Sequence, residues 1–242
     1  MMVRRTSRSL HRRRPRPLSG FTLMETSLAT VIIGVGVLAI IEAQQSFLRA
    51  NAWSTHASTA TYLASELREM SRNFPRHDRF TGGIYFTDPS DTSSLNGWGP
   101  ESGEVNTIDL DDLDDLDGAV FGNATEFPDG FTMSTRYPGP ISAFGTIIPE
   151  TLWDGTSESI LVNGVEQIIP MRGWTQIVEV EKVDPLDYAT KVATNAVELD
   201  DDDNVVRGVD RYPLRVTVTI LYQGEFDAEA PPVTSISWVV PP

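Results

Sequence analysis

The chain has 242 residues, of which 40% are apolar, and it contains no cysteine. That length suits one globular domain with an appendage. The missing cysteines exclude a disulfide framework, a thiolate metal site and a cysteine nucleophile. Seven arginines and no acid precede Gly20, which leaves 12 basic against 34 acidic side chains, a net charge of −22, in the rest of the chain. A region that acidic argues against nucleic-acid binding, because phosphate contacts require Lys and Arg.

A basic segment, residues 1–20, precedes an apolar run at residues 21–41 in which Glu25 is the only charged residue. A helix of that length covers about 31 Å, close to the ~30 Å hydrocarbon core of a bilayer. The sequence therefore predicts the transmembrane half of a helix, with the arginines holding the N-terminus in the cytoplasm. An ordinary cleaved secretory signal fits poorly, because no Ala-x-Ala type site ends the run. Arg4-Arg5 imitates a twin-arginine signal but lies far from the apolar region.

The junction reads Ser19-Gly20-Phe21-Thr22-Leu23-Met24-Glu25. A basic leader that ends in Gly, followed by Phe-Thr-Leu-x-Glu and an apolar helix, resembles the processing site of type IV prepilins and type II secretion pseudopilins. The resemblance covers roughly residues 1–50. This sequence departs from the family pattern in its long leader, in Ser19, in Thr26 and Ser27, and in a second acid, Glu42.

The resemblance implies that a prepilin peptidase cuts between Gly20 and Phe21 and N-methylates the new amine of Phe21. It also implies a single-pass protein of the inner membrane, with a cytoplasmic N-terminus and a head in the periplasm or in an extracellular filament. The implied partners are the peptidase, other pilins or pseudopilins, and the assembly platform of the inner membrane.

Glu25 is costly in such a helix, because a carboxylate at mid-depth costs about 2.5–3.5 kcal/mol on insertion scales and less near the interface. Cleavage would create an ammonium at Phe21, and in a bundle of helices this amine could pair with Glu25 of a neighbouring subunit. Our hypothesis is that Glu25 selects the register of filament assembly. The alternative is a glutamate that merely snorkels to the headgroups.

Residues 42–74 change to an amphipathic pattern, which predicts that one helix runs from about residue 22 to 73 and stops before Pro75. Its apolar positions recur every three or four residues. They are Phe47, Ala50, Trp53, Ala57, Ala60, Leu63, Leu67, Met70 and Phe74. The segment "TATYLASELREMSR" resembles the corresponding part of PilV-type minor pilins, and a generic amphipathic helix is the alternative.

Residues 75–170 read as a loop-rich acidic variable region, with short strands near Gly83–Thr87, Gly130–Arg136 and Ser159–Asn163. Residues 171–242 read as the antiparallel sheet of the head. Its predicted strands are Trp174–Val183, Leu214–Tyr222 and Thr234–Val240, with short edge strands at Val197 and Val205–Val206. One long helix followed by strands predicts an α+β fold of pilin type, with the sheet packed on the amphipathic half of the helix.

Two aspartate-rich runs are candidate cation sites, since some pseudopilins bind calcium in the head. The first is Asp109–Gly118, in which Leu110, Leu113 and Leu116 recur every three residues and Thr107 could cap a short helix. An EF-hand loop is excluded because Leu113 takes a ligand position. The second is the turn-like Asp200–Asn204. Calcium would use Asp109, Asp111, Asp112, Asp200 and Asp202. Solvated acidic turns without any cofactor are the preferred interpretation.

Recognised catalytic motifs are absent from the sequence, and nothing suggests a desolvated partner for its acid pairs, so we expect no enzyme. We expect a structural minor subunit, a minor pilin or pseudopilin, and the sequence does not decide between pilus and secretion system. An uncleaved, signal-anchored periplasmic binding module is the alternative.

Overall fold

The computed structural model describes residue 20, residues 22–78 and residues 83–242. The chain divides into two units, residues 1–51 and residues 52–242, which we describe separately. One helix, α1 (Leu23–Ser71), belongs to both units and matches the helix predicted for residues 22–73.

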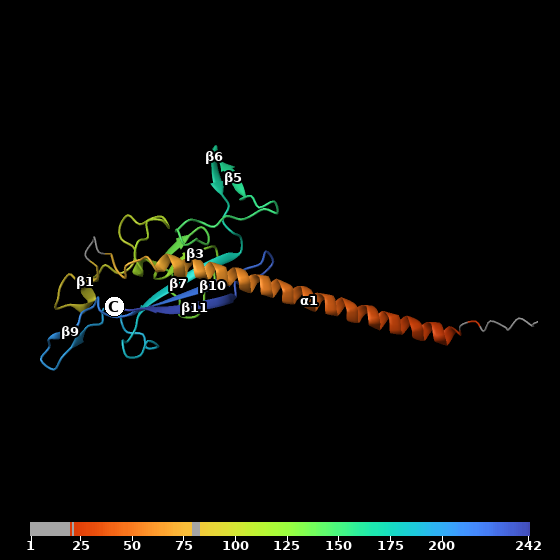
Figure 1. Cartoon of the computed structure of the whole chain (residues 1–242), viewed down its shortest axis with the longest axis horizontal. Helices are drawn as coiled ribbons and strands as arrows, with labels where there is room; N and C mark the ends of the chain where they lie inside the picture. Colours follow the sequence, from red (N-terminus) through yellow and green to blue (C-terminus); the bar gives the residue numbers. More distant parts are fainter. Residues whose placement is uncertain (1–19, 21, 79–82) are drawn as a thin grey trace, which may run out of the picture. The chain divides into compact units, whose positions relative to one another are not determined.

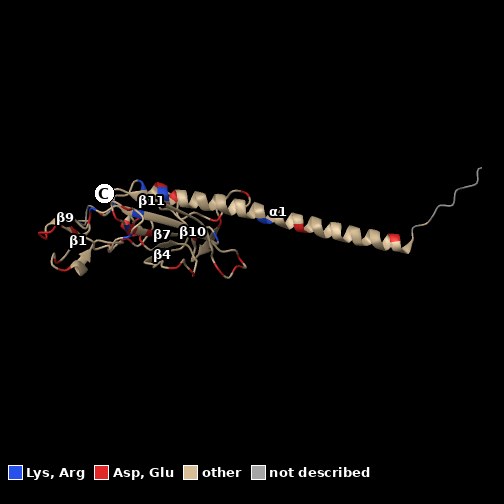
Figure 2. Ribbon diagram, turned by 90° about the horizontal axis from the view of Figure 1, so that it is seen from below, with Lys and Arg blue, Asp and Glu red and all other residues tan. Residues whose placement is uncertain are grey.

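In the N-terminal unit, every described side chain of α1 is exposed. Its only charged residues are Glu25, Glu42 and Arg49. Figure 2 accordingly shows few red or blue positions along this part of the helix. This part of the helix is long and apolar enough to cross a membrane. Thr26 and Ser27 donate hydrogen bonds from their hydroxyls to the carbonyl of Leu23, as helical hydroxyls in apolar surroundings do.

The C-terminal unit contains a five-stranded sheet in the order β11 (Pro232–Val240), β10 (Leu214–Tyr222), β7 (Trp174–Lys182), β3 (Ala119–Phe121) and β4 (Thr135–Tyr137). All neighbours pair antiparallel except β3 and β4, which are parallel. The three long strands confirm the predicted ones. The strand expected near Gly130–Arg136 forms later, at Thr135–Tyr137, and β3 was not predicted because three residues carry no alternation pattern.

One face of this sheet packs against the second half of α1, as the α+β prediction required (Figure 1). Ala60, Leu63, Leu67 and Met70 lie in the same core as alternate residues of β10 and β7. Trp53, predicted on the packed face, is instead 72% exposed. Buried Gln176 of β7 donates to the carbonyl of Leu63 at 2.9 Å, which links the sheet to the helix backbone.

Three short hairpins contain the remaining described strands of this unit. They are β1 (Tyr85–Phe86) with β2 (Leu95–Asn96), β5 (Ser159–Val162) with β6 (Val165–Ile168), and β8 (Glu198–Leu199) with β9 (Val205–Arg207). The predictions near Gly83–Thr87, Ser159–Asn163 and Val205–Val206 are therefore confirmed. Two 3₁₀ turns, η1 (Thr92–Ser94) and η2 (Asp114–Leu116), lie in the connections.

The segment between η2 and β3 makes its turn at Gly118, which has φ +71°. A Cβ at this position would come within 2.5 Å of the carbonyl oxygen of Thr132 and 2.8 Å of the amide nitrogen of Ser134. Only glycine tolerates both that backbone conformation and that close approach. Gly118 thus fixes how the aspartate run that precedes it enters the sheet.

Candidate functional site

The residues predicted for processing and assembly are only partly described by the structure. Gly20 is exposed, whereas Phe21 and the rest of the basic leader lie outside the described residues. Glu25 lies in the first turn of α1, where its amide donates to the carbonyl and the hydroxyl of Thr22 at 3.0 and 3.3 Å. Thr22 therefore caps the helix. The ion pairs found among the described residues do not include Glu25.

The middle of the first aspartate run is buried, so the prediction of a solvated turn is wrong there, although Asp111 is exposed. Asp112, Asp114 and Asp115 are each at most 1% exposed. The cause is the apolar residue at every third position, since Leu110, Leu113 and Leu116 all point into the main core. Thr107 does not cap a helix as predicted, because its hydroxyl donates to the carbonyl of Gly145 at 2.6 Å.

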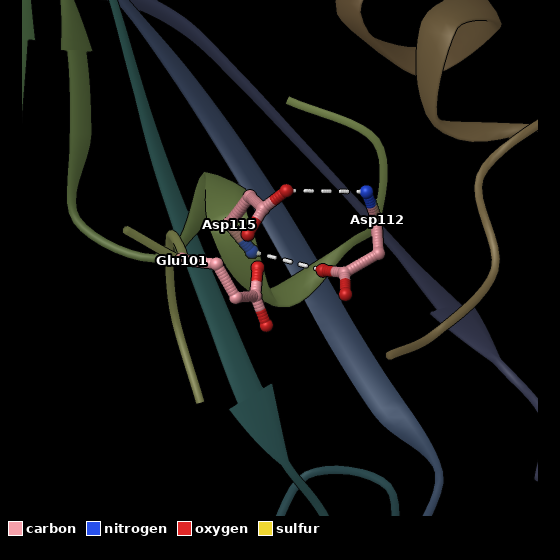
Figure 3. Close-up of side chains that lie close together, drawn as sticks. All are labelled: Glu101, Asp112 and Asp115. Atoms are coloured by element: carbon pink, nitrogen blue, oxygen red, sulfur yellow. Dashed lines mark hydrogen bonds between the residues drawn. The ribbon is translucent and has the colours of Figure 1, made fainter. Parts of the chain in front are cut away.

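Asp112 and Asp115 cap each other's backbone around η2 (Figure 3). Asp112 Oδ1 accepts from the amides of Asp114 and Asp115 at 3.0 and 3.2 Å. Asp115 Oδ2 accepts from the amides of Asp111 and Asp112 at 3.0 and 3.2 Å. Each carboxylate thus uses one oxygen on the turn, and the turn holds the two side chains at fixed positions.

Glu101 approaches the same place from the loop after β2. Glu101, Asp112 and Asp115 each bring one carboxylate oxygen within 4.8 Å of the others, and Glu104, Asp111 and Asp115 form a second such group. Burial raises the pKa of Asp112 to about 8, helped by the charge of Asp114. Burial, with repulsion from Asp112, raises the pKa of Asp115 to about 7. Burial, a hydrogen bond with Glu104 and the charge of Asp115 raise the pKa of Glu101 to about 8.

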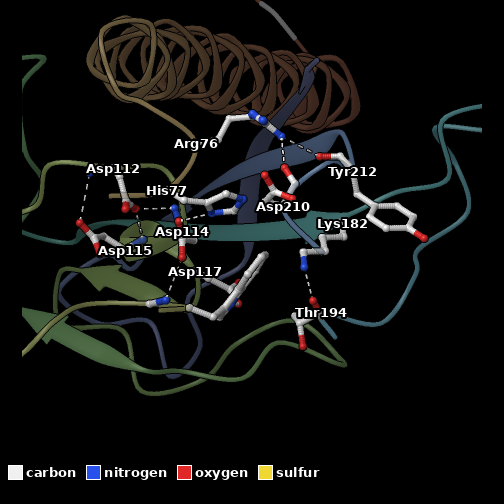
Figure 4. Close-up of polar contacts among 12 residues, drawn as sticks. Arg76, His77, Asp112, Asp114, Asp115, Asp117, Lys182, Thr194, Asp210 and Tyr212 are labelled. Carbon is white, nitrogen blue, oxygen red and sulfur yellow. Dashed lines mark hydrogen bonds and ion pairs between the residues drawn. The ribbon is translucent and has the colours of Figure 1, made fainter. Parts of the chain in front are cut away.

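Asp114 and Asp117 of the same run have a different role, because protein groups form hydrogen bonds with both oxygens of each side chain (Figure 4). Asp114 shares a hydrogen bond of 2.7 Å with His77 Nδ1 and accepts from the amide of Gly99 at 3.1 Å. Burial lowers the pKa of His77 to about 3, so this contact joins a neutral imidazole to the carboxyl group and is not an ion pair. Asp117 accepts from the amide of Val180 and from Trp98 Nε1, each at 3.0 Å.

The cations nearest to this run are bound elsewhere. Lys182 is fully buried, lies 5.4 Å from the ring centre of Trp98 and donates to the carbonyl of Thr194. Arg76 donates to the carbonyls of Asp210 and Tyr212 at 2.9 and 3.1 Å. The ion pairs recorded for the described residues include none to Asp112 or Asp115. The polar cluster around η2 therefore has two sides. On one side, protein groups form hydrogen bonds with both oxygens of Asp114 and of Asp117. The other side consists of the carboxylates of Glu101, Asp112 and Asp115.

The structure separates the five aspartates that the sequence offered as cation ligands. Asp112 and Asp111 each belong to one of the two carboxylate groups, and Asp109, Asp200 and Asp202 belong to neither. Asp109 Oδ2 accepts hydrogen bonds from the backbone amide and the side-chain amide of Asn106. Asp200 and Asp202 lie exposed in the turn between β8 and β9, where Asp200 accepts from the amides of Asp202 and Asn204.

Sequence reasoning missed Glu101, Asp115, Asp114, His77 and Lys182. A signal was present for the aspartates, because leucines at every third position bury one side of a 3₁₀ turn and draw the intervening residues inward. Nothing in the sequence links Glu101 or His77 to the run, since both reach it through loop geometry.

Comparisons of this chain with family models, with curated proteins and with solved structures each found no match. Any functional conclusion therefore depends on the residues themselves.

Proposed function

We propose that this chain is a minor subunit, a minor pilin or pseudopilin, of a filament rooted in the inner membrane. The observation that carries the proposal is the order of the N-terminal features: seven arginines, Gly20-Phe21, then Glu25 in the first turn of one unbroken helix. A basic leader, a glycine before the cut and an acid five residues into the mature chain are what processing and assembly of this class require.

The two halves of α1 support the same function. The first half is apolar and exposed, which suits lipid or the apolar helices of other subunits. The second half packs against the sheet of the head. A subunit built this way would bind its neighbours through the helix and present its acidic head at the filament surface.

The experiment is to express the full chain with and without a prepilin peptidase and to determine its N-terminal residue by mass spectrometry. We expect a mature chain that begins at Phe21 only when the peptidase is present. A chain that keeps its arginine leader in both cases would contradict the proposal and would favour an uncleaved, signal-anchored binding module.

Glu25 is the residue we propose to select register during assembly. Glu25→Ala should leave cleavage at Phe21 intact and should reduce incorporation into filaments at least about tenfold, because a methylated amine then lacks its acidic partner in the bundle. The measurement is the amount of chain in a sheared filament fraction. Glu42→Ala is the matched control, since it removes the other acid of α1 within residues 1–51. Normal incorporation of Glu25→Ala would contradict the register hypothesis.

A further inference from the structure

The carboxylate side of the polar cluster contains a buried oxygen that no protein group satisfies. Asp115 is fully buried, and its Oδ1 has no hydrogen-bond partner among the described residues. Its Oδ2 already accepts two backbone amides, so the side chain cannot turn to satisfy Oδ1 without losing them. An unsatisfied buried polar atom costs about 1–3 kcal/mol, and more when it is charged, so a position like this calls for an unseen partner.

The surroundings of Asp115 identify the charge of that partner. In Figure 3 the side chains of Glu101, Asp112 and Asp115 converge, and one carboxylate oxygen of each lies within 4.8 Å of the other two. Glu104 and Asp111 approach Asp115 in a second group of the same dimensions. Like charges at this spacing repel strongly in a buried site. A cation between the carboxylates would convert that repulsion into coordination.

The chemistry of the donors and the segments that carry them indicate the class of cation. Every donor in both groups is a carboxylate oxygen, which hard cations prefer, whereas zinc favours nitrogen and sulfur. Calcium takes about six to eight oxygen ligands in a flexible geometry, whereas magnesium requires a near-ideal octahedron with bonds of about 2.1 Å. Ligands on a loop and a short turn also suit the flexible coordination of calcium.

We propose that Glu101, Asp112 and Asp115 bind one calcium-class divalent cation, with Glu104 and Asp111 as further carboxylates close to Asp115. The cation would join the loop that carries Glu101 to the turn η2. Because Leu113 and Leu116 anchor that turn in the core, binding at this centre would stabilise the head as a whole and not only its surface loop.

The test uses the full chain, purified in detergent and stripped with a chelator. Calorimetric titration with calcium chloride should show one equivalent bound, and a hundredfold excess over the dissociation constant should raise the melting temperature by roughly 5–10 °C. Magnesium chloride at the same concentration should give a much smaller shift.

Asp115→Asn should lower calcium affinity at least about 100-fold, because the oxygen that faces Glu101 loses its charge while the carbonyl oxygen of the amide still accepts from the turn. Glu101→Gln, which changes the ligand on the loop, should lower calcium affinity by a similar factor. It provides the test if Asp115→Asn fails to fold. Asp202→Asn in the exposed turn is the matched control and should bind calcium as the unchanged chain does.

Two results would overturn the proposal. The first is the absence of saturable calcium binding by the stripped chain. The second is binding that survives both Asp115→Asn and Glu101→Gln, or that Asp202→Asn abolishes. Preference for zinc or magnesium over calcium would overturn the assignment of the cation class.

Discussion

The two aspartate-rich runs of the head have similar compositions and opposite environments. In Asp109–Gly118 the aspartates alternate with leucines that enter the core, and three of the carboxylates are buried. In Asp200–Asn204 no apolar residue interrupts the run, and all five residues are exposed in the turn between β8 and β9. This difference shows that the apolar residues between the acids, and not the number of acids, determine whether a carboxylate is desolvated.

The largest difference between the two runs should appear when an apolar anchor is shortened. Leu113 is fully buried, so Leu113→Ala should lower the free energy of unfolding by about 2–5 kcal/mol. Val206, beside the exposed run, is 62% exposed, and Val206→Ala should change the free energy of unfolding by less than about 0.5 kcal/mol. Urea unfolding followed by tryptophan fluorescence measures both. Equal effects of the two changes would show that the leucines do not anchor the first run.

The pH dependence of stability should have opposite signs for the two runs. Asp112 and Asp115 have pKa values raised to about 8 and about 7, so between roughly pH 4 and pH 8 the folded chain holds protons that the unfolded chain has lost. Without divalent cations, stability from these groups is therefore present below about pH 4 and is lost as pH rises toward 8. The loss should appear as a melting temperature that falls as the pH is raised through this range.

The exposed run should behave in the reverse way. Hydrogen bonds from Asn204 hold the pKa of Asp200 below its usual range, so this group contributes stability above that range and loses it on acidification. Thermal unfolding in chelator-treated buffer at several pH values measures the combined curve. Asp200→Asn should alter the melting temperature only in the acidic part of that curve. Stability that rises from pH 5 to pH 8 without cations would contradict the burial of the first run.

A single charge change should separate the runs further. In chelator-treated buffer at pH 8, Asp115→Asn should stabilise the head by about 1 kcal/mol, because it removes one of several like charges at a site without a counter-ion. The same variant should lose the calcium-dependent rise in melting temperature. Asp202→Asn should change neither quantity. Destabilisation by Asp115→Asn in the absence of cations would mean that the Asp115 charge is compensated within the protein.

The smallest effect should follow removal of the carboxylate that organises the exposed turn. Asp200 accepts from the amides of Asp202 and Asn204 and from the side-chain amide of Asn204. Asp200→Ala should open the β8–β9 turn locally and leave the global melting temperature unchanged. Faster hydrogen exchange at the amide of Asn204 is the measurement. A drop in the global melting temperature would mean that the exposed turn is coupled to the core.

The sequence predicts the periodic parts of this fold and misses the parts set by loops. Leu214–Tyr222 alternates apolar and polar residues, and Leu63, Leu67 and Met70 follow helical spacing, so both elements could be placed from pattern alone. β3 has three residues, all buried, and pairs in parallel with β4, which no local pattern indicates.

The candidate sites divide in the same way. The processing and assembly roles that we propose for Gly20, Phe21 and Glu25 depend on their spacing along the chain, so the sequence alone can suggest them. The sequence alone does not suggest the carboxylate cluster, because Glu101 reaches Asp115 through a loop whose course depends on tertiary contacts such as the Asp114–Gly99 hydrogen bond. Only Asp111 and Asp112 of the cation ligands expected from the sequence belong to it.

The central claim is that this chain is processed and assembled into a filament through its N-terminal helix. The most direct measurement is the N-terminal residue of the chain recovered from a sheared filament fraction of cells that produce it. The account predicts a chain that begins at N-methylated Phe21 and is present in that fraction. A chain that is absent from the fraction, or that retains the arginine leader before Gly20, would contradict it.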